Sequence, residues 1–495
     1  MKKLDCRVTT HGERELEAHL VYPLSSDSKR SEYCLDWYIF SPPQLAVEPP
    51  RYTVRNLMDD LQVYVRYSTP IVPLAKLADK SCDISPLIRI RRALADGTAK
   101  IGEQQLQREL RLLTNIFHDQ MRENRVRLCN MLESQTSPEM VLPSCDFFLE
   151  ELAYFLDDLR SLHILFLDPR VKESDREGLH WADEAISLRT EKTLMRLHKK
   201  LGDKPELEAA RQKIMEQLRG EARYRAKRGY ASVVEKDKPL SLETFLFRES
   251  VLKKWSQSAL YLSLEHAKTV GRIAHIIAGF AAAVAMAFAV AATVAAQQYY
   301  AQFTLPWAIL VVIAYIFKDR LKEMLREALI SRVPRLVADD VRWLKDHSGK
   351  KAGLRKARVI FAEPAQLPGE IIRVRNLKGN PFQGILPQEN VVQYHLETVF
   401  FGKALPKDSL SETAEEIMRL NLHEWMVKMD TAMDQVSFVD GDRVETGYGQ
   451  RVYHLNMVLA LSEKQNGKVE MICKYRGIVT RSGIIRVEHV ESLHS

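Results

Sequence analysis

Hydrophobic residues are concentrated near the middle of the chain, where residues 273–317 include no Lys, Arg, Asp or Glu. The first arm of this stretch, 273–296, would be about 36 Å long as a helix, which exceeds a bilayer core of about 30 Å. The second arm, 299–317, reaches spanning length only if residues 299–302 are helical and Pro306 is accommodated as a kink. The pattern therefore predicts a two-helix transmembrane hairpin.

Basic residues flank both ends of this stretch and predict its orientation. Because cationic flanks are retained on the cytoplasmic side of a membrane, we expect two spans, with both termini in the cytoplasm and the turn on the far side. Such an internal anchor indicates an inner or plasma membrane. The alternative, a hairpin buried inside a soluble protein, is disfavoured by the length of the uncharged stretch. The flanking cations are Lys253, Lys254, Lys268, Arg272, Lys318, Arg320, Lys322 and Arg326, and the rings of Tyr299, Tyr300, Phe303 and Trp307 cluster near the turn.

Small residues recur at every fourth position of the first arm and predict a packing face. A ridge of this kind lets another helix approach closely, which is how membrane helices associate. Two interpretations are open: packing against the chain's own second arm, or association of two copies into a homo-oligomer. The ladder consists of Gly279, Ala283, Ala287, Ala291 and Ala295.

Residues 71–240 carry the period of amphipathic helices. Large apolar side chains recur at helical spacing in 102–132 and 147–166, and two further helices are expected at 181–201 and 205–228. Several such helices in succession are typical of a bundle. We therefore expect a cytoplasmic helical bundle in this region.

The segments around the bundle and the anchor are expected to be simpler. Short strand-like runs in residues 1–70 predict a small mixed β element. Ser241 is a candidate N-cap for a juxtamembrane stalk helix at 241–272 that continues into the first arm. A second juxtamembrane helix is expected at 318–346, and the two helices could pair as an antiparallel coiled coil beneath the membrane.

Beyond a basic linker at 349–358, the apolar period changes from helical to alternating. The alternation, the hairpin turn at Asn466-Gly467 and a capped helix from Ser409 to about residue 433 predict an α+β domain with an antiparallel meander at 358–490. The whole chain is then a multidomain α+β membrane protein. Strands are expected at 359–361, 370–375, 391–400, 451–461, 469–475 and 484–490.

Charge adds one candidate surface. The net charge of +7 is compatible with an anionic membrane face and too small to indicate nucleic acid by itself. Basic residues nevertheless cluster in 211–228. This cluster is interpreted as a solvated helix face or as a contact with anionic lipid headgroups, and binding to a phosphate backbone is the least favoured reading. The candidate membrane-surface residues are Arg219, Arg223, Arg225, Lys227 and Arg228.

The sequence contains only fragments of known catalytic and ligand-binding motifs. The Gly-Lys pairs lack the frame of a phosphate loop, and His423-Glu424 is followed by Val427 where a zinc protease needs its second histidine. The six cysteines form no Cys-x-x-Cys pair, a usage typical of free thiols in a reducing cytosol. We therefore predict no catalytic residue, no cofactor and no metal site. The histidines that are candidates for a metal ligand or an intramembrane ionisable group are His275, His395, His454 and His489.

These patterns favour an interaction protein over an enzyme. We expect a membrane-anchored cytoplasmic scaffold or signalling protein whose partners are the lipid bilayer and an unidentified cytoplasmic protein. One alternative is a pore-forming protein that inserts its hydrophobic hairpin, although the cationic flanks and the large β-containing region count against it. The other is an enzyme whose site lies in the C-terminal domain without a recognisable motif.

Overall fold

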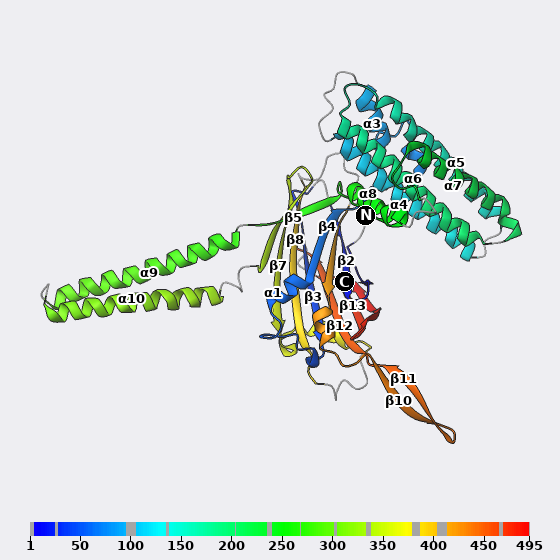
Figure 1. Cartoon of the computed structure of the whole chain (residues 1–495). Helices are drawn as coiled ribbons and strands as arrows, with labels where there is room; N and C mark the ends of the chain where they lie inside the picture. Colours follow the sequence, from blue (N-terminus) through cyan, green and yellow to red (C-terminus); the bar gives the residue numbers. More distant parts are fainter. Residues whose placement is uncertain are drawn as a thin grey trace. The chain divides into compact units, whose positions relative to one another are not determined.

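The computed structural model describes residues 4–24, 28–95, 105–134, 138–202, 204–234, 240–267, 269–300, 304–332, 338–378, 387–402, 413–464 and 469–494. The chain divides into two compact units (Figure 1). Unit 1 holds Met1–Val65, Leu262–Leu405 and Glu415–Ser495, and unit 2 holds Arg66–Tyr261 and Pro406–Ala414. Unit 1 is built on a large sheet, and unit 2 is mainly helical.

The main sheet has twelve strands in the described residues, in the order β1-β2-β9-β4-β5-β6-β7-β8-β3-β12-β13-β14. The last three strands pair antiparallel, which confirms mixed helix and sheet content with an antiparallel meander. The strands are β1 (Asp5–His11), β2 (Glu15–Pro23), β3 (Arg30–Ser41), β4 (Leu61–Tyr67), β5 (Tyr261–His266), β6 (Asp340–Lys345), β7 (Lys351–Ala362), β8 (Asn390–Phe401), β9 (Thr413–Asn421), β12 (Tyr453–Glu463), β13 (Val469–Thr480) and β14 (Gly483–His494).

The sheet is curled, so that its first and last strands approach each other. The backbone N–H of Ile484 on β14 donates to the carbonyl oxygen of Glu13 beside β1 at 2.7 Å. The hydroxyl of Tyr475 on β13 donates to the carbonyl oxygen of Cys6 on β1 at 3.0 Å. These bonds cover part of the two edges, and unpaired edges are the usual liability of an open sheet.

Alternation along the strands explains which face of the sheet is buried. On β2, every second side chain is buried, from Leu16 to Tyr22. On β3 the alternation gives way to burial on both faces from Trp37 to Ser41. The second face is buried there because α11 (Gly369–Asn376) packs Ile371 and Val374 against Tyr38, Phe40 and neighbouring strands.

Smaller elements connect the strands of unit 1. They are η1 (Pro43–Leu45), α1 (Val54–Asp60), η4 (Pro364–Gln366) and α12 (His423–Val427). A separate two-stranded sheet, β10 (Met433–Asp440) with β11 (Arg443–Gln450), forms a β hairpin. All eight residues of β10 are exposed, so this hairpin is stabilised by its own pairing and by its root.

Two long helices interrupt the sheet between neighbouring strands. Helix α9 (Thr269–Tyr299) follows β5, and α10 (Leu305–Arg332) precedes β6. Strands β5 and β6 pair antiparallel, with Ser263 opposite Lys345. The chain therefore leaves the sheet before α9 and returns to it after α10 at two neighbouring strands. They pack against each other as a helical hairpin (Figure 1).

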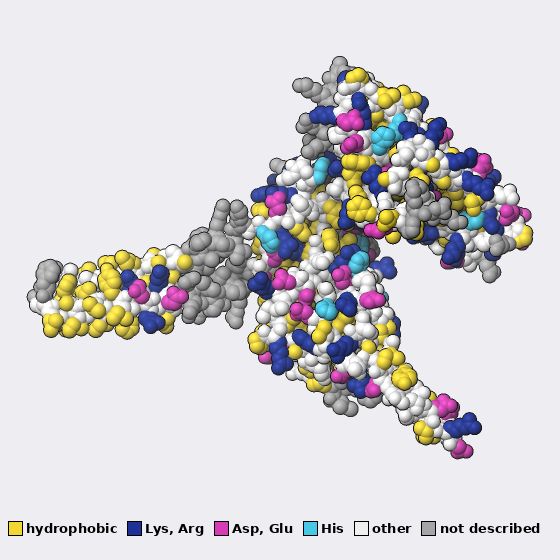
Figure 2. Space-filling view, viewed as in Figure 1, with side chains coloured by type: hydrophobic (Ala, Val, Ile, Leu, Met, Phe, Trp, Pro, Cys, Tyr) yellow, Lys and Arg dark blue, Asp and Glu magenta, His cyan; other side chains and the backbone are white. Residues whose placement is uncertain are grey.

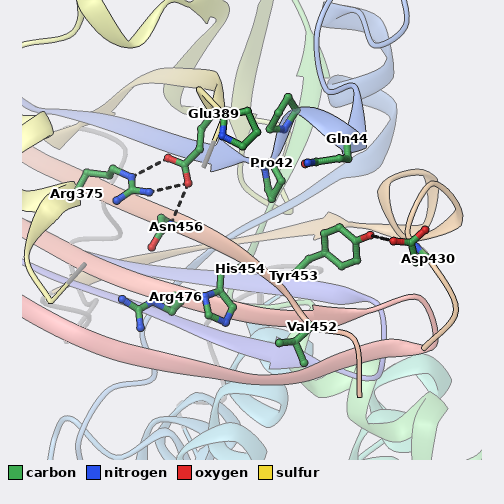
Figure 3. A pocket seen from close by; sticks show the side chains of 12 residues that line it. Pro42, Gln44, Arg375, Glu389, Asp430, Val452, Tyr453, His454, Asn456 and Arg476 are labelled. Carbon is green, nitrogen blue, oxygen red and sulfur yellow. Dashed lines mark hydrogen bonds and ion pairs between the residues drawn. The ribbon is translucent and has the colours of Figure 1, made fainter. Parts of the chain in front are cut away.

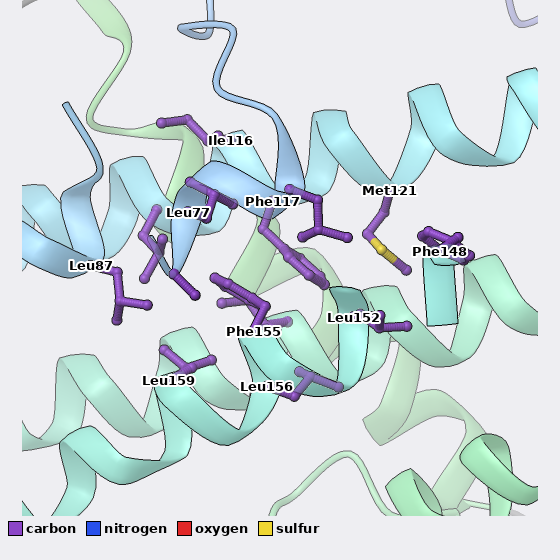
Figure 4. Packing of buried hydrophobic residues seen from close by; sticks show 14 of the residues in the cluster. Leu77, Leu87, Ile116, Phe117, Met121, Phe148, Leu152, Phe155, Leu156 and Leu159 are labelled. Carbon is purple, nitrogen blue, oxygen red and sulfur yellow. The ribbon is translucent and has the colours of Figure 1, made fainter. Parts of the chain in front are cut away.

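Unit 2 is held together by a core of buried leucine, isoleucine and phenylalanine side chains (Figure 4). Phe117 and Phe155 stack at its centre, with ring centroids 4.9 Å apart. The four helices expected from the sequence correspond to α4, α5, α6 and α7. The helices are α2 (Leu74–Leu77), α3 (Pro86–Ala95), α4 (Gln105–Glu133), α5 (Pro138–Leu165), α6 (Glu173–Leu201), α7 (Glu208–Arg228) and α8 (Leu240–Gln257), with η2 (Pro205–Leu207) before α7.

The expected stalk helices are wrong. Helix α8 ends at Gln257, and the chain then forms β5 instead of continuing into the anchor. Likewise α10 ends at Arg332, and the end of the helix expected at 318–346 is β6. A local apolar period does not reveal that β5 and β6 can complete each other's hydrogen bonds. The two strands therefore replace the expected coiled coil.

The division into a β element at 1–70 and a domain at 358–490 also differs from the structure. Strand β3 lies between β8 and β12, so strands from both predicted regions share one sheet. The expected linker at 349–358 belongs largely to β7. Pairing partners are a property of the folded chain, and the pattern of a single strand does not specify them.

Two elements of the C-terminal region have the opposite type from the one expected. The predicted strand at 370–375 is α11, whose Ile371 and Val374 lie on one helical face against the sheet. The predicted helix from Ser409 to about 433 is occupied by β9, the short α12 and the start of β10. On β9 the buried positions alternate but include Glu416, which hid the strand period. Ser409 itself lies outside the described residues.

Candidate membrane anchor and polar sites

The hairpin of α9 and α10 carries an apolar surface that the protein itself leaves uncovered. In α9, residues Ala278–Tyr299 are long and apolar enough to cross a membrane, and most of them are not buried. Figure 2 shows hydrophobic side chains covering the visible face of both helices, with charged side chains gathered toward the root. The large exposed side chains are Phe280, Val284, Met286, Phe288, Val290, Val294, Leu305, Ile309, Leu310, Val312, Ile313, Tyr315, Ile316 and Phe317.

Helix α10 is shorter in apolar length than α9. It is uncharged only from Leu305 to Phe317, which corresponds to roughly 20 Å of helix. Lys318 and Asp319 follow, 3.7 Å apart, and the Lys318 ammonium lies 4.4 Å from the centre of the Tyr315 ring. Among the residues that the structure describes, α9 alone meets the length and composition expected of a membrane span.

Alanines of α9 form the seam between the two helices. Ala281, Ala285, Ala289 and Ala296 are buried, and Ala314 is their buried counterpart on α10. The small side chains allow the helix backbones to approach closely, because no bulky group separates them.

This seam differs from the ladder expected from the sequence. The five ladder residues, Gly279, Ala283, Ala287, Ala291 and Ala295, are all exposed. The interpretation that the ladder packs against the chain's own second arm is therefore wrong. An alanine-rich helix offers small residues on several faces, so spacing alone did not distinguish the face that meets α10. Association of two copies through the ladder stays a hypothesis.

The rings expected at the membrane interface lie where the hairpin turns. Tyr299 and Tyr300 are exposed, the former by 83%. Trp307 is half-buried in the first turns of α10. Phe303, Lys268 and the side chains of Arg272, His275 and Arg326 lie outside the described residues.

The basic cluster on α7 divides into surface and buried members. Arg219, Arg223, Lys227 and Arg228 are exposed. Arg225 is only 4% exposed, forms an ion pair with Glu191 and donates to the Ser187 hydroxyl at 3.1 Å. The expectation that Arg225 contacts a membrane surface is therefore wrong, since its guanidinium is directed into the bundle.

Arg225 belongs to a network of buried polar groups inside unit 2. Arg160 pairs with Glu221 at 2.7 Å, and Glu221 also accepts from the Ser187 hydroxyl at 2.6 Å. Each of these carboxylates and cations finds a partner within the bundle, so the cost of burying charge is offset by charge-assisted hydrogen bonds. A network of this kind fixes the register of α5, α6 and α7.

Asp183 is the centre of the second half of this network. Its carboxylate has no solvent exposure and accepts hydrogen bonds from Tyr230 at 2.7 Å and from Tyr224, with His163 Nε2 at 2.9 Å. Burial raises its pKa, but these hydrogen bonds and the charge of Arg160 outweigh burial, so the pKa lies below its ordinary value. The group is therefore a fixed anion, which suits a structural role better than proton transfer.

A second buried cluster lies inside the curled sheet of unit 1. Arg355 on β7 donates to Glu416 on β9 at 2.7 Å and to the Tyr394 hydroxyl. Glu416 also accepts from Tyr22 at 3.1 Å and from Thr398 at 3.2 Å. Sequence reasoning missed this cluster. The available signal was an Arg in phase with the small residues Gly353 and Ala357 on an alternating strand.

A pocket of about 380 Å³ lies on unit 1, near the root of the β10–β11 hairpin (Figure 3). Arg375 and Glu389 form a bidentate ion pair on one side of it. On the other side, the Tyr453 hydroxyl is hydrogen-bonded to Asp430. In Figure 3, His454 and Arg476 are drawn next to each other, below Asn456. Of the residues that line it, only His454 is a candidate from the sequence.

The candidate metal-binding histidines have separate partners. His395 pairs with Asp36 at 2.8 Å, which raises its pKa, whereas His489 contacts the Ser492 hydroxyl and the ring of Tyr475. His454 lines the pocket instead. Within the described ranges, no group of three His, Cys, Asp or Glu residues is arranged to hold a metal ion.

Comparison with known proteins found no matching family model, no matching curated protein and no matching solved structure.

Proposed function

We propose that this protein is a membrane-anchored scaffold, held in an inner or plasma membrane by the α9–α10 hairpin. The observation that carries the proposal is the apolar surface of the hairpin, which the rest of unit 1 leaves exposed. Phe280, Met286 and Phe288 on α9 and Ile309 and Ile316 on α10 all expose more than a third of their surface. An exposed apolar surface of this kind is stable in lipid and is an aggregation site in water.

The position of the hairpin in the sheet supports two spans with one cytoplasmic root. The hairpin is inserted between β5 and β6, so its two arms leave and return at the same place. Lys318, Arg320 and Lys322 follow the apolar part of α10, where cations are retained on the cytoplasmic side. The short apolar length of α10 is accommodated by local thinning of the bilayer or by its flanking lysines reaching the interface. In this arrangement both units and both termini are cytoplasmic.

A scaffold role follows from what the anchor holds. Unit 2 contains long helices whose buried groups Asp183, Glu221 and Arg225 are paired. Unit 1 adds an exposed β hairpin with Val439, Val444 and Tyr448 each 74% exposed. Surfaces of this kind are more typical of protein-binding sites than of catalytic sites. A cytoplasmic protein is therefore the partner class that we propose.

Insertion is tested with one charge placed on the hairpin. Phe288→Arg, near the middle of Ala278–Tyr299, should shift the full-length protein from the alkali-resistant membrane fraction toward the extractable fraction, because a central Arg costs roughly 2.5–3.5 kcal/mol on insertion. Val126→Arg is the matched control, since Val126 is an exposed apolar residue of α4 in unit 2. Extraction of the unsubstituted protein by alkaline carbonate would refute the anchor.

Orientation is tested with a membrane-impermeant thiol reagent on sealed vesicles of either orientation. Cysteine at Tyr299, beside the hairpin turn, should react only from the far side, and cysteine at Val444 only from the cytoplasmic side. The parent protein corrects for its own cysteines. Reaction of both positions from the same side would show that the hairpin enters the membrane without crossing it. Release of the protein into the cytosolic fraction without detergent would instead favour a pore-forming protein before insertion.

A further inference from the structure

The pocket beside the β10–β11 hairpin combines an apolar wall with a fixed polar wall (Figure 3). Pro42, Pro43, Pro387, Val452 and the ring of Tyr453 form the apolar part. Its volume of about 380 Å³ falls within the range of small-molecule sites, roughly 300–1,000 Å³. The walls come from unit 1 alone, so the pocket is complete within one compact unit.

The side chains on one wall are held by their mutual hydrogen bonds. Arg375 donates to both carboxylate oxygens of Glu389, at 2.8 and 2.7 Å, and Asn456 donates to Glu389 at 3.2 Å. These bonds neutralise Glu389 and fix all three side chains. A preorganised wall loses little side-chain entropy when a ligand binds.

Arg476 is the cation that this arrangement leaves unneutralised. It lies on β13 directly opposite Asn456 of β12, and its guanidinium donates to the carbonyl oxygen of Lys378 at 2.6 Å. A carbonyl oxygen positions the guanidinium but carries no formal charge. In the described part of the chain, Arg476 has no carboxylate within ion-pair distance. Glu488, the residue opposite it on β14, is bonded to Arg486 at 2.8 Å.

Neighbouring titratable groups respond to this positive charge. Lys474, two residues earlier on β13, is buried and donates to the carbonyl oxygen of Arg375 at 2.6 Å. Burial, followed by the charges of Arg476 and Arg375, lowers the pKa of Lys474 to about 8. Burial and Arg476 likewise lower the pKa of His454, which is therefore a neutral hydrogen-bonding group at pH 7.

We propose that this pocket binds a small organic anion, with its carboxylate or phosphate against Arg476 and His454 and its apolar body against Tyr453 and the prolines. A guanidinium with a neutral imidazole beside it can form charge-assisted hydrogen bonds with such a group. The apolar wall accounts for the body of the ligand, since an inorganic ion would leave Pro42, Val452 and the ring of Tyr453 without a partner. The Asp430 carboxylate, which accepts from the Tyr453 hydroxyl at 3.0 Å, keeps the anionic end away from the Tyr453 hydroxyl.

The site does not depend on the proposed membrane role, because no residue of α9 or α10 lines it. It is tested on the full-length protein in detergent by titration calorimetry with phenyl phosphate and benzoate. Benzyl alcohol is the neutral probe with a similar body, and inorganic phosphate is the probe without a body. Binding of at least one aromatic anion, tighter than either of these controls, is expected. Whichever of phenyl phosphate and benzoate binds more tightly shows whether the site prefers a phosphate or a carboxylate head group.

Two variants locate the binding. Arg476→Gln should weaken the binding of the preferred anion by about tenfold, the effect of losing one charge-assisted hydrogen bond. Arg443→Gln, an exposed arginine on β11, should bind as the unsubstituted protein does. Val452→Trp fills the pocket without changing its charge and should abolish binding even if Arg476→Gln proves unstable. Absence of binding to both anions at about 10 mM, equal binding of benzyl alcohol, or undiminished binding by Val452→Trp would overturn the proposal.

Discussion

Arg355 and Glu416 form an ion pair inside the curled sheet, with the Nε and Oε1 atoms 2.7 Å apart and side-chain exposures of 1% and 0%. The two residues lie on β7 and β9, which are not neighbours in the sheet. The pair therefore connects the sheet across its interior. Tyr22, Thr398 and Tyr394 satisfy the remaining hydrogen-bonding positions around it.

Removing one partner of this pair should be more harmful than removing both. Arg355→Met leaves the Glu416 carboxylate buried and uncompensated, and we expect a loss of about 3–5 kcal/mol in the free energy of unfolding. Arg355→Met combined with Glu416→Gln should recover part of that loss, because no unpaired charge remains. Thermal unfolding of both proteins in detergent measures the difference. A double variant no more stable than the single one would show that the pair contributes by shape instead of charge.

Asp183 should make unit 2 sensitive to acid. Its folded-state pKa lies below the ordinary value of about 3.9, so its contribution is fully present above that pH and is lost as pH falls through the folded pKa. The protection of α6 amides, measured by hydrogen exchange relative to the intrinsic rate at each pH, should therefore fall below about pH 4. Asp183→Asn should exchange faster than the parent at pH 7 and show a smaller change on acidification. An identical acid response in both proteins would assign the effect to other carboxylates.

Two alanines of α9 that are only two residues apart should differ in how strongly a leucine substitution destabilises the hairpin. Ala285 is 1% exposed and faces α10, whereas Ala287 is exposed. Ala285→Leu overpacks the seam and should destabilise the hairpin by about 1–3 kcal/mol. Ala287→Leu should change stability by less than about 0.5 kcal/mol. Amide exchange of α10 peptides provides the measurement.

The same pair of variants also tests the exposed ladder. If two copies associate through the face that holds Ala287, Ala287→Leu should reduce crosslinking between chains while leaving α10 exchange unchanged. Equal crosslinking in the parent and in Ala287→Leu would count against the homo-oligomer.

Substitutions of a buried and of an exposed arginine on α7 should have different effects on stability. Arg225→Met removes the partner of the partly buried Glu191 and of Ser187, so the melting temperature of unit 2 should fall. Arg223→Gln should leave the melting temperature unchanged, because its side chain is exposed and bonds only locally, to the Arg219 carbonyl at 3.2 Å. If the exposed face of α7 contacts anionic lipid, Arg223→Gln should also weaken cosedimentation with vesicles rich in anionic lipid. Unchanged cosedimentation would favour a solvated helix face.

Local patterns of the sequence determined the elements that depend on their own residues. The uncharged run of α9 and α10, the helical periods of α4 to α7 and the alternation of β12 are each visible in one segment. These elements could be predicted because a helix forms its hydrogen bonds within itself and because burial on one face imposes a period of 3.6 or 2.

The tertiary structure decided which faces meet and which strands pair. The seam of α9 includes Ala285 and excludes Ala287, β5 replaces the expected stalk, and β3 joins strands from the other end of the chain. Arg225, Arg355 and Glu416 are charged residues that ordinarily face water, and their partners come from distant segments. Burial of such a group is favourable only when a partner at the right distance offsets its desolvation. That partner exists only once the chain has folded.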